Sequence, residues 1–265
     1  MKGPRRSYSS TAERFRVFWS DKETNLLQGD NDDGFRRARA NEMRELFSFQ
    51  SVDKVLEIGC GDGTLFSYLW GPRTDYKGID FSPQFIEKFR AKYPAAKLEC
   101  KEGASYQDGN LYDLIFLDGV LQHFDRGMLE QHLRNACFMM GDGGCLIWGS
   151  IPRRCLRMQY DLGRFGATKP SLVCLAKSWL ARLLGRDAMG YWYEPAEIET
   201  LARKYGLRTK IVASSMFPYR FHAVLSKTAK PVGATVPIHG FSAEIKLKAG
   251  NGQSIPAAAW KSRLR

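Results

Sequence analysis

The stretch Glu57-Ile58-Gly59-Cys60-Gly61-Asp62-Gly63-Thr64 decides the fold. It ends a short apolar run that begins at Lys54 and predicts a strand, and it leads into a helical pattern at residues 64–69. Glycines at alternate positions let the backbone turn tightly and approach a ligand closely. In open α/β sheets, ligands bind in the crevice at the carboxyl ends of the strands. We therefore predict a ligand-binding turn between a first strand and a first helix.

Strand and helix patterns alternate after this turn. Further strands are predicted at residues 76–80, 97–101, 111–117, 145–148, 207–213 and 221–226, and further helices after Ser82-Pro83, at 127–140 and at 195–205. Such alternation is typical of a parallel sheet with covered faces, and the last two strands are close enough in sequence to form an antiparallel pair. The expected fold class is α/β: a Rossmann-like doubly wound sheet of about seven strands with a reversed last strand, plus N-terminal helices and a helical lid insertion.

The sequence predicts three parts. Residues 1–50 form an N-terminal helical segment, and residues 51–229 form the α/β domain, with residues 153–192 as a lid insertion. Residues 230–265, which are rich in proline and glycine, form a loosely ordered C-terminal tail.

Composition excludes several classes of protein. The 265 residues have an ordinary globular composition, and no window reaches the roughly 18 apolar residues that a membrane-spanning helix needs. The N-terminus lacks the apolar stretch of a secretory signal. The six cysteines do not have zinc-finger spacing, so we expect reduced thiols, no metal and a cytoplasmic location.

The net charge of +12 is spread unevenly. Residues 51–150 carry a net charge of −4, whereas residues 151–265 carry +14. Such an asymmetry concerns partners rather than fold. The acidic third contains the glycine turn, and the basic third contains the insertion.

The charge of the glycine turn discriminates between two classes of nucleoside ligand. Asp80 ends the second predicted strand, where its carboxylate could accept both ribose hydroxyls of an adenosine. The dinucleotide pattern G-x-G-x-x-G is not met, because the sixth position is Thr64 or Phe66, and Glu57 would repel a pyrophosphate. A methionine-derived ligand carries an ammonium and a sulfonium, so an acidic turn suits it.

Five segments together resemble one enzyme family. Residues 55–64 are similar to motif I of the class I S-adenosylmethionine-dependent methyltransferases, of the small-molecule and polysaccharide-pathway type. The other four segments resemble the strands and turns that follow motif I: Gly78-Ile79-Asp80-Phe81-Ser82, Leu111-Tyr112-Asp113-Leu114-Ile115-Phe116, Val120-Leu121-Gln122-His123-Phe124 and Gly143-Gly144-Cys145-Leu146-Ile147. The resemblance implies S-adenosyl-L-methionine as the cofactor.

The resemblance also implies cofactor-binding residues at the ends of the first four strands. They are Glu57, Gly59, Gly61, Gly63, Asp80, Phe81, Glu102, Asp118 and Gly119. In that family the glycines surround the methionyl part and Glu57 lies near its ammonium. Asp80 would hold the ribose and Phe81 would flank the adenine. Glu102 would meet the adenine amino group, and Asp118 with its following glycine would lie beside the transferred methyl.

The acceptor side offers fewer signals. His123 follows the fourth strand and is our candidate catalytic base, because the pKa of histidine suits proton transfer at neutral pH. Tyr191, Trp192 and Tyr193 could line an acceptor pocket or could anchor the insertion to the core. His222, on a closing strand, is either a substrate contact or a hydrogen-bonded sheet residue.

The insertion is basic and contains an apolar stripe. Residues 153–186 carry eight basic residues and one acidic residue, and residues 172–183 place leucines and a tryptophan at helical spacing. Such a segment is an ordinary amphipathic helix, a cover for an anionic acceptor, or a peripheral contact with an anionic membrane. Nucleic acid is a weaker alternative, because the aromatic residues are not interleaved with the basic ones.

The favoured function is S-adenosylmethionine-dependent methyl transfer to a small-molecule or carbohydrate-type acceptor, with an anionic glycan as one candidate. We expect a cytoplasmic enzyme with peripheral membrane contact as one option. One alternative is an RNA methyltransferase that binds through the basic C-terminal third. Another is a non-catalytic partner protein that binds the cofactor. The sequence does not indicate an oligomeric state.

Overall fold

The computed structural model describes residues 33–47, 49, 52–165, 171–183 and 189–227. Most of the predicted N-terminal helical segment, residues 1–32, and the predicted tail at residues 230–265 lie outside the described residues.

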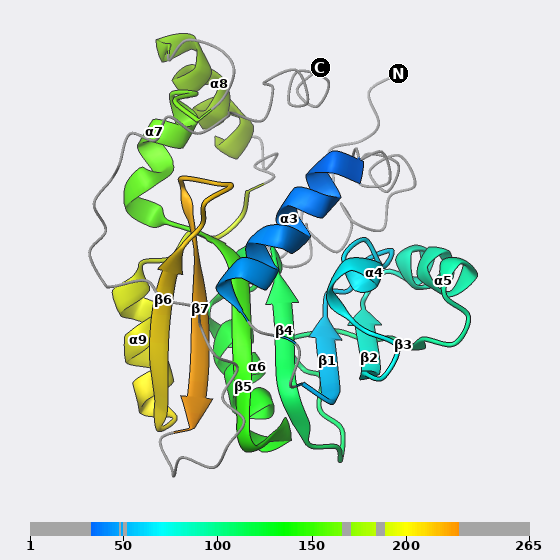
Figure 1. The fold of residues 1–265 in the computed structure, drawn as a ribbon. Helices are drawn as coiled ribbons and strands as arrows, with labels where there is room; N and C mark the ends of the chain where they lie inside the picture. Colours follow the sequence, from blue (N-terminus) through cyan, green and yellow to red (C-terminus); the bar gives the residue numbers. More distant parts are fainter. Residues whose placement is uncertain (1–32, 48, 50–51, 166–170, 184–188, 228–265) are drawn as a thin grey trace.

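In the described part of the chain, seven strands form one sheet (Figure 1). They are β1 (Lys54–Ile58), β2 (Asp75–Asp80), β3 (Lys97–Cys100), β4 (Tyr112–Asp118), β5 (Met140–Pro152), β6 (Leu207–Ala213) and β7 (Arg220–Lys227). The helices are α3 (Asp33–Leu46), α4 (Phe66–Leu69), α5 (Pro83–Lys92), η1 (Leu121–His123), α6 (Arg126–Met139), η2 (Arg154–Leu156), α7 (Arg157–Asp161), α8 (Leu172–Leu183) and α9 (Pro195–Lys204).

The order of the strands confirms the predicted fold class. Across the sheet the order is β3-β2-β1-β4-β5-β7-β6. The pairs from β3 to β5 are parallel, and β7 runs antiparallel to both of its neighbours. The sheet is therefore a doubly wound α/β sheet with a reversed last strand. This arrangement brings the carboxyl ends of β1 to β5 and the beginning of β7 to one edge, which we call the carboxyl edge.

Helices cover both faces of the sheet. Alternate residues of β1 enter different cores: Leu56 and Ile58 pack with α6 and α9, while Val55 packs with α3, α4 and α5. The period of two along a strand therefore requires apolar residues on both sides, which explains the continuous apolar runs of β1 and β4.

Local signals start the helices where the sequence predicts. The backbone N–H of Phe85 donates to the Ser82 hydroxyl, and Pro83 occupies the first turn of α5. Asp125 caps α6 by accepting a hydrogen bond from the N–H of Met128 at 2.9 Å. These caps satisfy backbone donors that a helix leaves without an internal partner.

One predicted boundary is wrong. The sequence predicts a strand only over residues 145–148, but β5 runs from Met140 to Pro152. The two glycines before Cys145 belong to an irregular part of the strand, because a Cβ atom on Gly144 would lie 2.7 Å from the carbonyl oxygen of Tyr112 on the neighbouring strand. The far end of β5 pairs with β7 through Ile151 and Phe221.

The described part of the insertion lies beyond the carboxyl edge (Figure 1). It consists of η2, α7 and α8. A hydrogen-bonded ion pair of 2.7 Å between Arg182 and Asp161 ties α8 to α7. The insertion is therefore fixed at the same edge as the turn after β1.

A buried carboxylate fastens α3 across the sheet. Oε1 of Glu42 accepts hydrogen bonds from the Ser214 hydroxyl at 2.8 Å, and from the backbone N–H groups of Ser215 at 2.6 Å and Met216 at 3.1 Å. Burial raises the pKa of Glu42, but the adjacent His222 and these donors outweigh it and hold the pKa at about 2. Glu42 thus joins α3 to the turn between β6 and β7 as an ionised group.

We expect Glu42→Ala to lower the free energy of unfolding by about 3 kcal/mol, because it leaves several buried donors without an acceptor. Glu45→Ala, on the exposed side of the same helix, is the control and should change stability by less than about 0.5 kcal/mol. Chemical denaturation at neutral pH measures both. Equal effects of the two variants would contradict the role of Glu42.

Candidate functional site

Backbone hydrogen bonds hold the turn after β1 to the end of β2. The N–H groups of Gly59 and Cys60 donate to the carbonyl oxygen of Ile79 at 2.8 and 3.1 Å. Gly59 has a φ of +75°, and a Cβ atom there would lie 2.3 Å from a methyl carbon of Val120. Gly61 has a φ of +55° with nothing within 4 Å of a Cβ position. The turn is therefore packed on one side and open at Gly61.

Asp80 joins this turn to the second strand. Its Oδ2 accepts from the N–H of Gly61 at 3.0 Å, and its Oδ1 accepts from the N–H of Ser82 at 2.8 Å. Burial raises the pKa of Asp80 to about 6, although these N–H groups oppose the shift. Each carboxylate oxygen can accept a further bond, so Asp80 retains capacity for a ligand.

Glu57 lies on the side of β1 that faces α3 and α4. Its Oε2 accepts from the indole N–H of Trp70 at 3.0 Å and from the hydroxyl of Tyr76 at 2.8 Å. Burial, together with the nearby carboxylates of Asp118 and Asp80, raises the pKa of Glu57 to about 7, although the two hydrogen bonds oppose the shift. The group is therefore close to half protonated at neutral pH.

Asp118 ends β4 and is paired with an arginine from α3. Nε of Arg39 lies 2.5 Å from Oδ2 of Asp118, whose side chain is 3% exposed. Burial raises the pKa of Asp118, but the guanidinium outweighs it and holds the pKa below its ordinary value. At Gly119, which has a φ of +70°, a Cβ atom would lie 3.1 Å from Nη2 of the same arginine. The predicted pair Asp118 and Gly119 thus lies directly beneath α3.

Glu102 and Phe81 are half buried near these carboxylates. Phe81 follows Asp80 directly, and its carbonyl oxygen accepts from the thiol of Cys100 at 3.4 Å. Glu102 follows Lys101, whose N–H donates to the carbonyl oxygen of Asp80 at 2.9 Å. All the residues predicted for the cofactor therefore lie in or directly after the ends of β1, β2, β3 and β4, at the carboxyl edge.

His222 lies in a buried polar network at the same edge. Its Nδ1 accepts from the N–H of Ser150 at 3.2 Å, and its Nε2 lies 3.7 Å from Oε1 of Glu42. Ser150 has a φ of 55°, which is uncommon for a residue other than glycine and costs free energy. Within the described residues, His222 is fully buried.

Four of the buried polar atoms around His222 make no hydrogen bond within the described residues. They are Oε2 of Glu42, Oδ1 of Asp118, Oγ of Ser150 and Nε2 of His222. Native proteins leave few such atoms without a partner, so a cluster of them indicates a place for water or for a polar ligand group.

His123 lies at the end of η1, just beyond β4. Nε2 of Gln122 is 3.3 Å from Nε2 of His123. The segment containing the three consecutive aromatic residues lies against η1, since the N–H of Tyr191 donates to the carbonyl oxygen of Gln122 at 2.8 Å. The hydroxyl of Tyr193 donates to the carbonyl oxygen of Phe124 at 2.7 Å. These contacts hold the end of the insertion beside the candidate base.

Trp192 belongs to an aromatic cluster at the carboxyl edge. The cluster also contains Phe217 and Tyr219 from the turn before β7, with Phe35 of α3 and Tyr160 of α7 packed against it. Further members or contacts are Leu156, Phe165, Met189 and Met216. Two arginines face its rings: Arg157 lies 5.4 Å from the ring of Trp192, and Arg220 lies 5.4 Å from that of Tyr219.

Sequence reasoning missed Arg39, Glu42 and Ser150. The first two lie three residues apart on α3, on the same side as the buried residues Ala40 and Met43. Charged residues on the apolar side of an amphipathic helix were the available signal. No sequence signal marks Ser150, because its backbone angle depends on the irregular pairing of β5 with β7.

The raised pKa of Glu57 predicts a pH-dependent stability. The folded state holds a proton up to about pH 7, whereas the ordinary pKa of the carboxyl group is 4.5, so the stability contribution of Glu57 falls as pH rises between these values. Glu57→Gln removes the buried charge and keeps an acceptor for Trp70 and Tyr76. We expect its melting temperature, relative to the wild type, to be higher at pH 8 than at pH 5 by about 2 °C or more. A pH-independent difference would refute this.

Comparison with known proteins agrees with this geometry. Residues 56–146 match a family described as a methyltransferase domain. The fold is similar to that of an O-methyltransferase family protein from Burkholderia thailandensis, with a TM-score of 0.60 and 15% identity over 80% of this chain and 61% of that one. It is also similar to the magnesium protoporphyrin IX methyltransferase of Synechocystis PCC 6803 with bound SAH, with a TM-score of 0.55 and 16% identity over 83% of this chain and 100% of that one.

A third similar structure is the mitomycin 7-O-methyltransferase MmcR, with a TM-score of 0.57 and 16% identity. The match covers 79% of this chain but only 59% of that protein. The family match covers the glycine turn, Asp80 and Asp118, which the fold brings to one edge. Residues 56–146 thus match a methyltransferase domain, and the fold of the described residues is similar to that of known methyltransferases.

Proposed function

We propose that this enzyme binds S-adenosylmethionine along the ends of β1 to β4 and methylates a small-molecule acceptor held between η1, α3 and the aromatic cluster. The observation that carries the proposal is the open, acidic glycine turn beside buried carboxylates. The most direct test supplies the purified chain and a small-molecule extract with cofactor labelled on its methyl group, and identifies the labelled product by mass spectrometry.

The residues present fit the cofactor. Nothing lies within 4 Å of a Cβ position on Gly61, so the turn is open there. The N–H of Gly61 donates to the carboxylate of Asp80 and orients it. The site contains three acidic side chains: Glu57, Asp80 and Asp118. Among the described contacts of these three, one arginine, Arg39, pairs with Asp118. This donor set suits a cationic ligand with ribose hydroxyls and would repel a diphosphate.

Each predicted cofactor residue has a role consistent with its surroundings. Asp80 would accept the ribose hydroxyls, with Phe81 and Glu102 beside the adenine. Glu57 would attract the ammonium, and Asp118 with its neighbour Gly119 would border the methionyl part. Because Arg39 is already fixed by Asp118, it would hold the ligand's carboxylate or keep α3 in place over the site.

The cofactor supplies, when bound, a methyl group already activated on a sulfonium. The protein's own residues must position the acceptor and accept a proton. His123 is the proposed base, because it follows the end of β4 and is half buried beside Tyr191 and its neighbours. Tyr191 would contact the acceptor, whereas Trp192 and Tyr193 would mainly hold the segment in place.

The aromatic cluster supports a flat, anionic acceptor. The indole nitrogen of Trp192 is buried and makes no hydrogen bond within the described residues. Arg157 and Arg220 add positive charge beside the aromatic rings. Two similar proteins are named for mitomycin and magnesium protoporphyrin IX as acceptors. We therefore favour an anionic ring compound over a glycan and over RNA.

Asp80→Asn should weaken cofactor binding by about one to two orders of magnitude, because hydrogen bonds to a charged group contribute roughly 1.5–3 kcal/mol. Asp75→Asn, at the exposed start of the same strand, is the matched control and should leave binding unchanged. Calorimetry with S-adenosylhomocysteine measures both. Unchanged affinity in Asp80→Asn would exclude the ribose role.

His123→Ala should lower kcat about 10²-fold or more while cofactor affinity stays the same, because general base catalysis contributes roughly 10² to 10⁴. Gln122→Ala, the adjacent residue, is the control and should lower kcat far less. The labelled-cofactor assay gives kcat once an acceptor is known. Normal turnover in His123→Ala would remove it as the base.

A further inference from the structure

The large apolar residues of α8 point away from the rest of the protein. Its smaller residues, among them Cys174, Ser178 and Ala181, are half buried. Five large apolar side chains are between 56% and 79% exposed: Leu172, Val173, Trp179, Leu180 and Leu183. An ordinary surface helix has the opposite orientation, with its apolar side toward the core.

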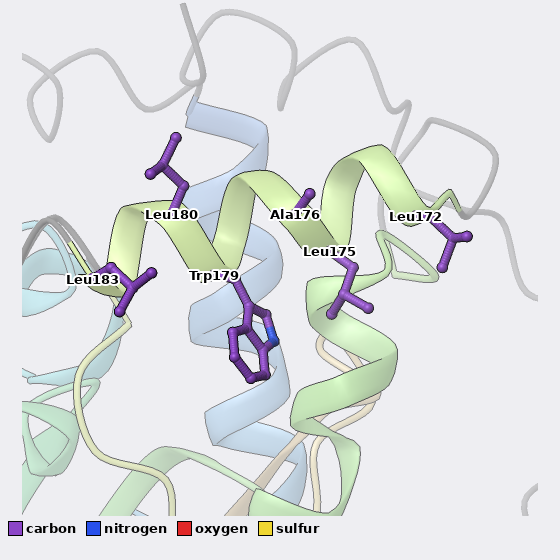
Figure 2. A pocket seen from close by; sticks show the side chains of 6 residues that line it. All are labelled: Leu172, Leu175, Ala176, Trp179, Leu180 and Leu183. Carbon is purple, nitrogen blue, oxygen red and sulfur yellow. The ribbon is translucent and has the colours of Figure 1, made fainter.

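Four of these five side chains, together with Leu175 and Ala176, form one continuous surface. Six residues of α8 line an open hollow of about 410 Å³: Leu172, Leu175, Ala176, Trp179, Leu180 and Leu183 (Figure 2). We call this surface the α8 stripe. Exposed apolar groups that are contiguous along a helix mark an interaction surface, whereas scattered ones do not.

The helix is held in this orientation by the rest of the insertion. Asp161 pairs with Arg182, and the N–H of Ser171 donates to the carbonyl oxygen of Leu162 at 3.0 Å. The ion pair fixes the less apolar side of α8 toward α7. The α8 stripe is therefore presented by a packed element.

The positive charge of the insertion indicates the kind of partner that the α8 stripe binds. The insertion, residues 153–186, carries a net charge of +7, and Lys177 lies exposed beside the stripe. A symmetric contact with a second copy would bring two such segments together, which like charges oppose. An anionic lipid surface would attract the basic residues, each contributing about 1 kcal/mol when close to it, and would accept the apolar side chains.

We propose that α8 docks the enzyme on an anionic membrane surface, with the α8 stripe inserted among the lipid headgroups and Lys177 at their level. The helix would lie in the interface, since no helix among the described residues is both long and apolar enough to cross a bilayer. This inference does not depend on methyl transfer, because docking requires neither cofactor nor acceptor.

The test uses the full chain with vesicles of phosphatidylcholine, with or without phosphatidylglycerol, in co-sedimentation. We expect binding to the anionic vesicles, weaker binding to neutral ones, and a loss of binding as salt rises. The double variant Trp179→Ser/Leu180→Ser should lower the partition coefficient about tenfold or more. Phe138→Ser, which removes an exposed apolar residue near the end of α6, is the matched control and should bind as the wild type does.

Four results would overturn the proposal. One is no binding of the wild type to anionic vesicles, and another is an equal loss of binding in Phe138→Ser. The third is a wild-type dimer in size-exclusion chromatography that the double variant dissolves without any vesicle binding, which would assign the stripe to a second copy. The melting temperature of the double variant should match that of the wild type, and a fall of more than about 2 °C would mean that protein already covers the stripe.

Discussion

Parallel pairing of β1 with β2 on one side and β4 on the other is the constraint on which the site depends. Three strands that run in the same direction and share a register must end at the same edge. The residues at their ends are far apart in sequence but adjacent in space: Gly59 to Gly63 follow β1, and Asp80 and Asp118 are the last residues of β2 and β4. The hydrogen bonds from the glycine turn to Ile79 and Asp80 hold this arrangement.

Much of the fold could be predicted because its signals are local. The period of apolar residues and the turn chemistry at Ser82 and Pro83 locate strands and helices within a few residues. The extension of β5 to Pro152 could not be predicted, since it depends on pairing with β7, more than sixty residues away. Likewise, the pair Gly143-Gly144 is typical both of a turn and of an irregular strand. The close approach of Gly144 to the carbonyl oxygen of Tyr112 shows that the pair belongs to a strand, and this contact cannot be predicted from sequence.

In the candidate site, too, some residues could be predicted from local sequence and others could not. Cofactor positions follow strand ends, so a motif with fixed spacing predicts their location, although their roles remain proposals. The contributions of Arg39 and Glu42 depend on how α3 crosses the sheet, which no local pattern determines. His222 illustrates the difference: its place on a closing strand could be predicted, but its burial against Glu42 and Ser150 could not.

The electrostatics of the edge also follow from packing. Burial leaves Glu57 and Asp80 with pKa values of about 7 and 6, and Arg39 neutralises Asp118. Near neutral pH, the acidic edge is thus only partly charged until a cation approaches. A cationic ligand would restore the missing charge by displacing protons.

Helix α3 contributes both to the core and to the candidate site. Ala40 and Met43 of α3, with Phe47 directly after it, fill the core on one face of the sheet, while Arg39 and Glu42 reach the candidate site from the same helix. Substitutions that shift this helix would therefore disturb the interior and the candidate site together. The described residues of the insertion contribute less to the two main cores, so substitutions there would disturb the interior less.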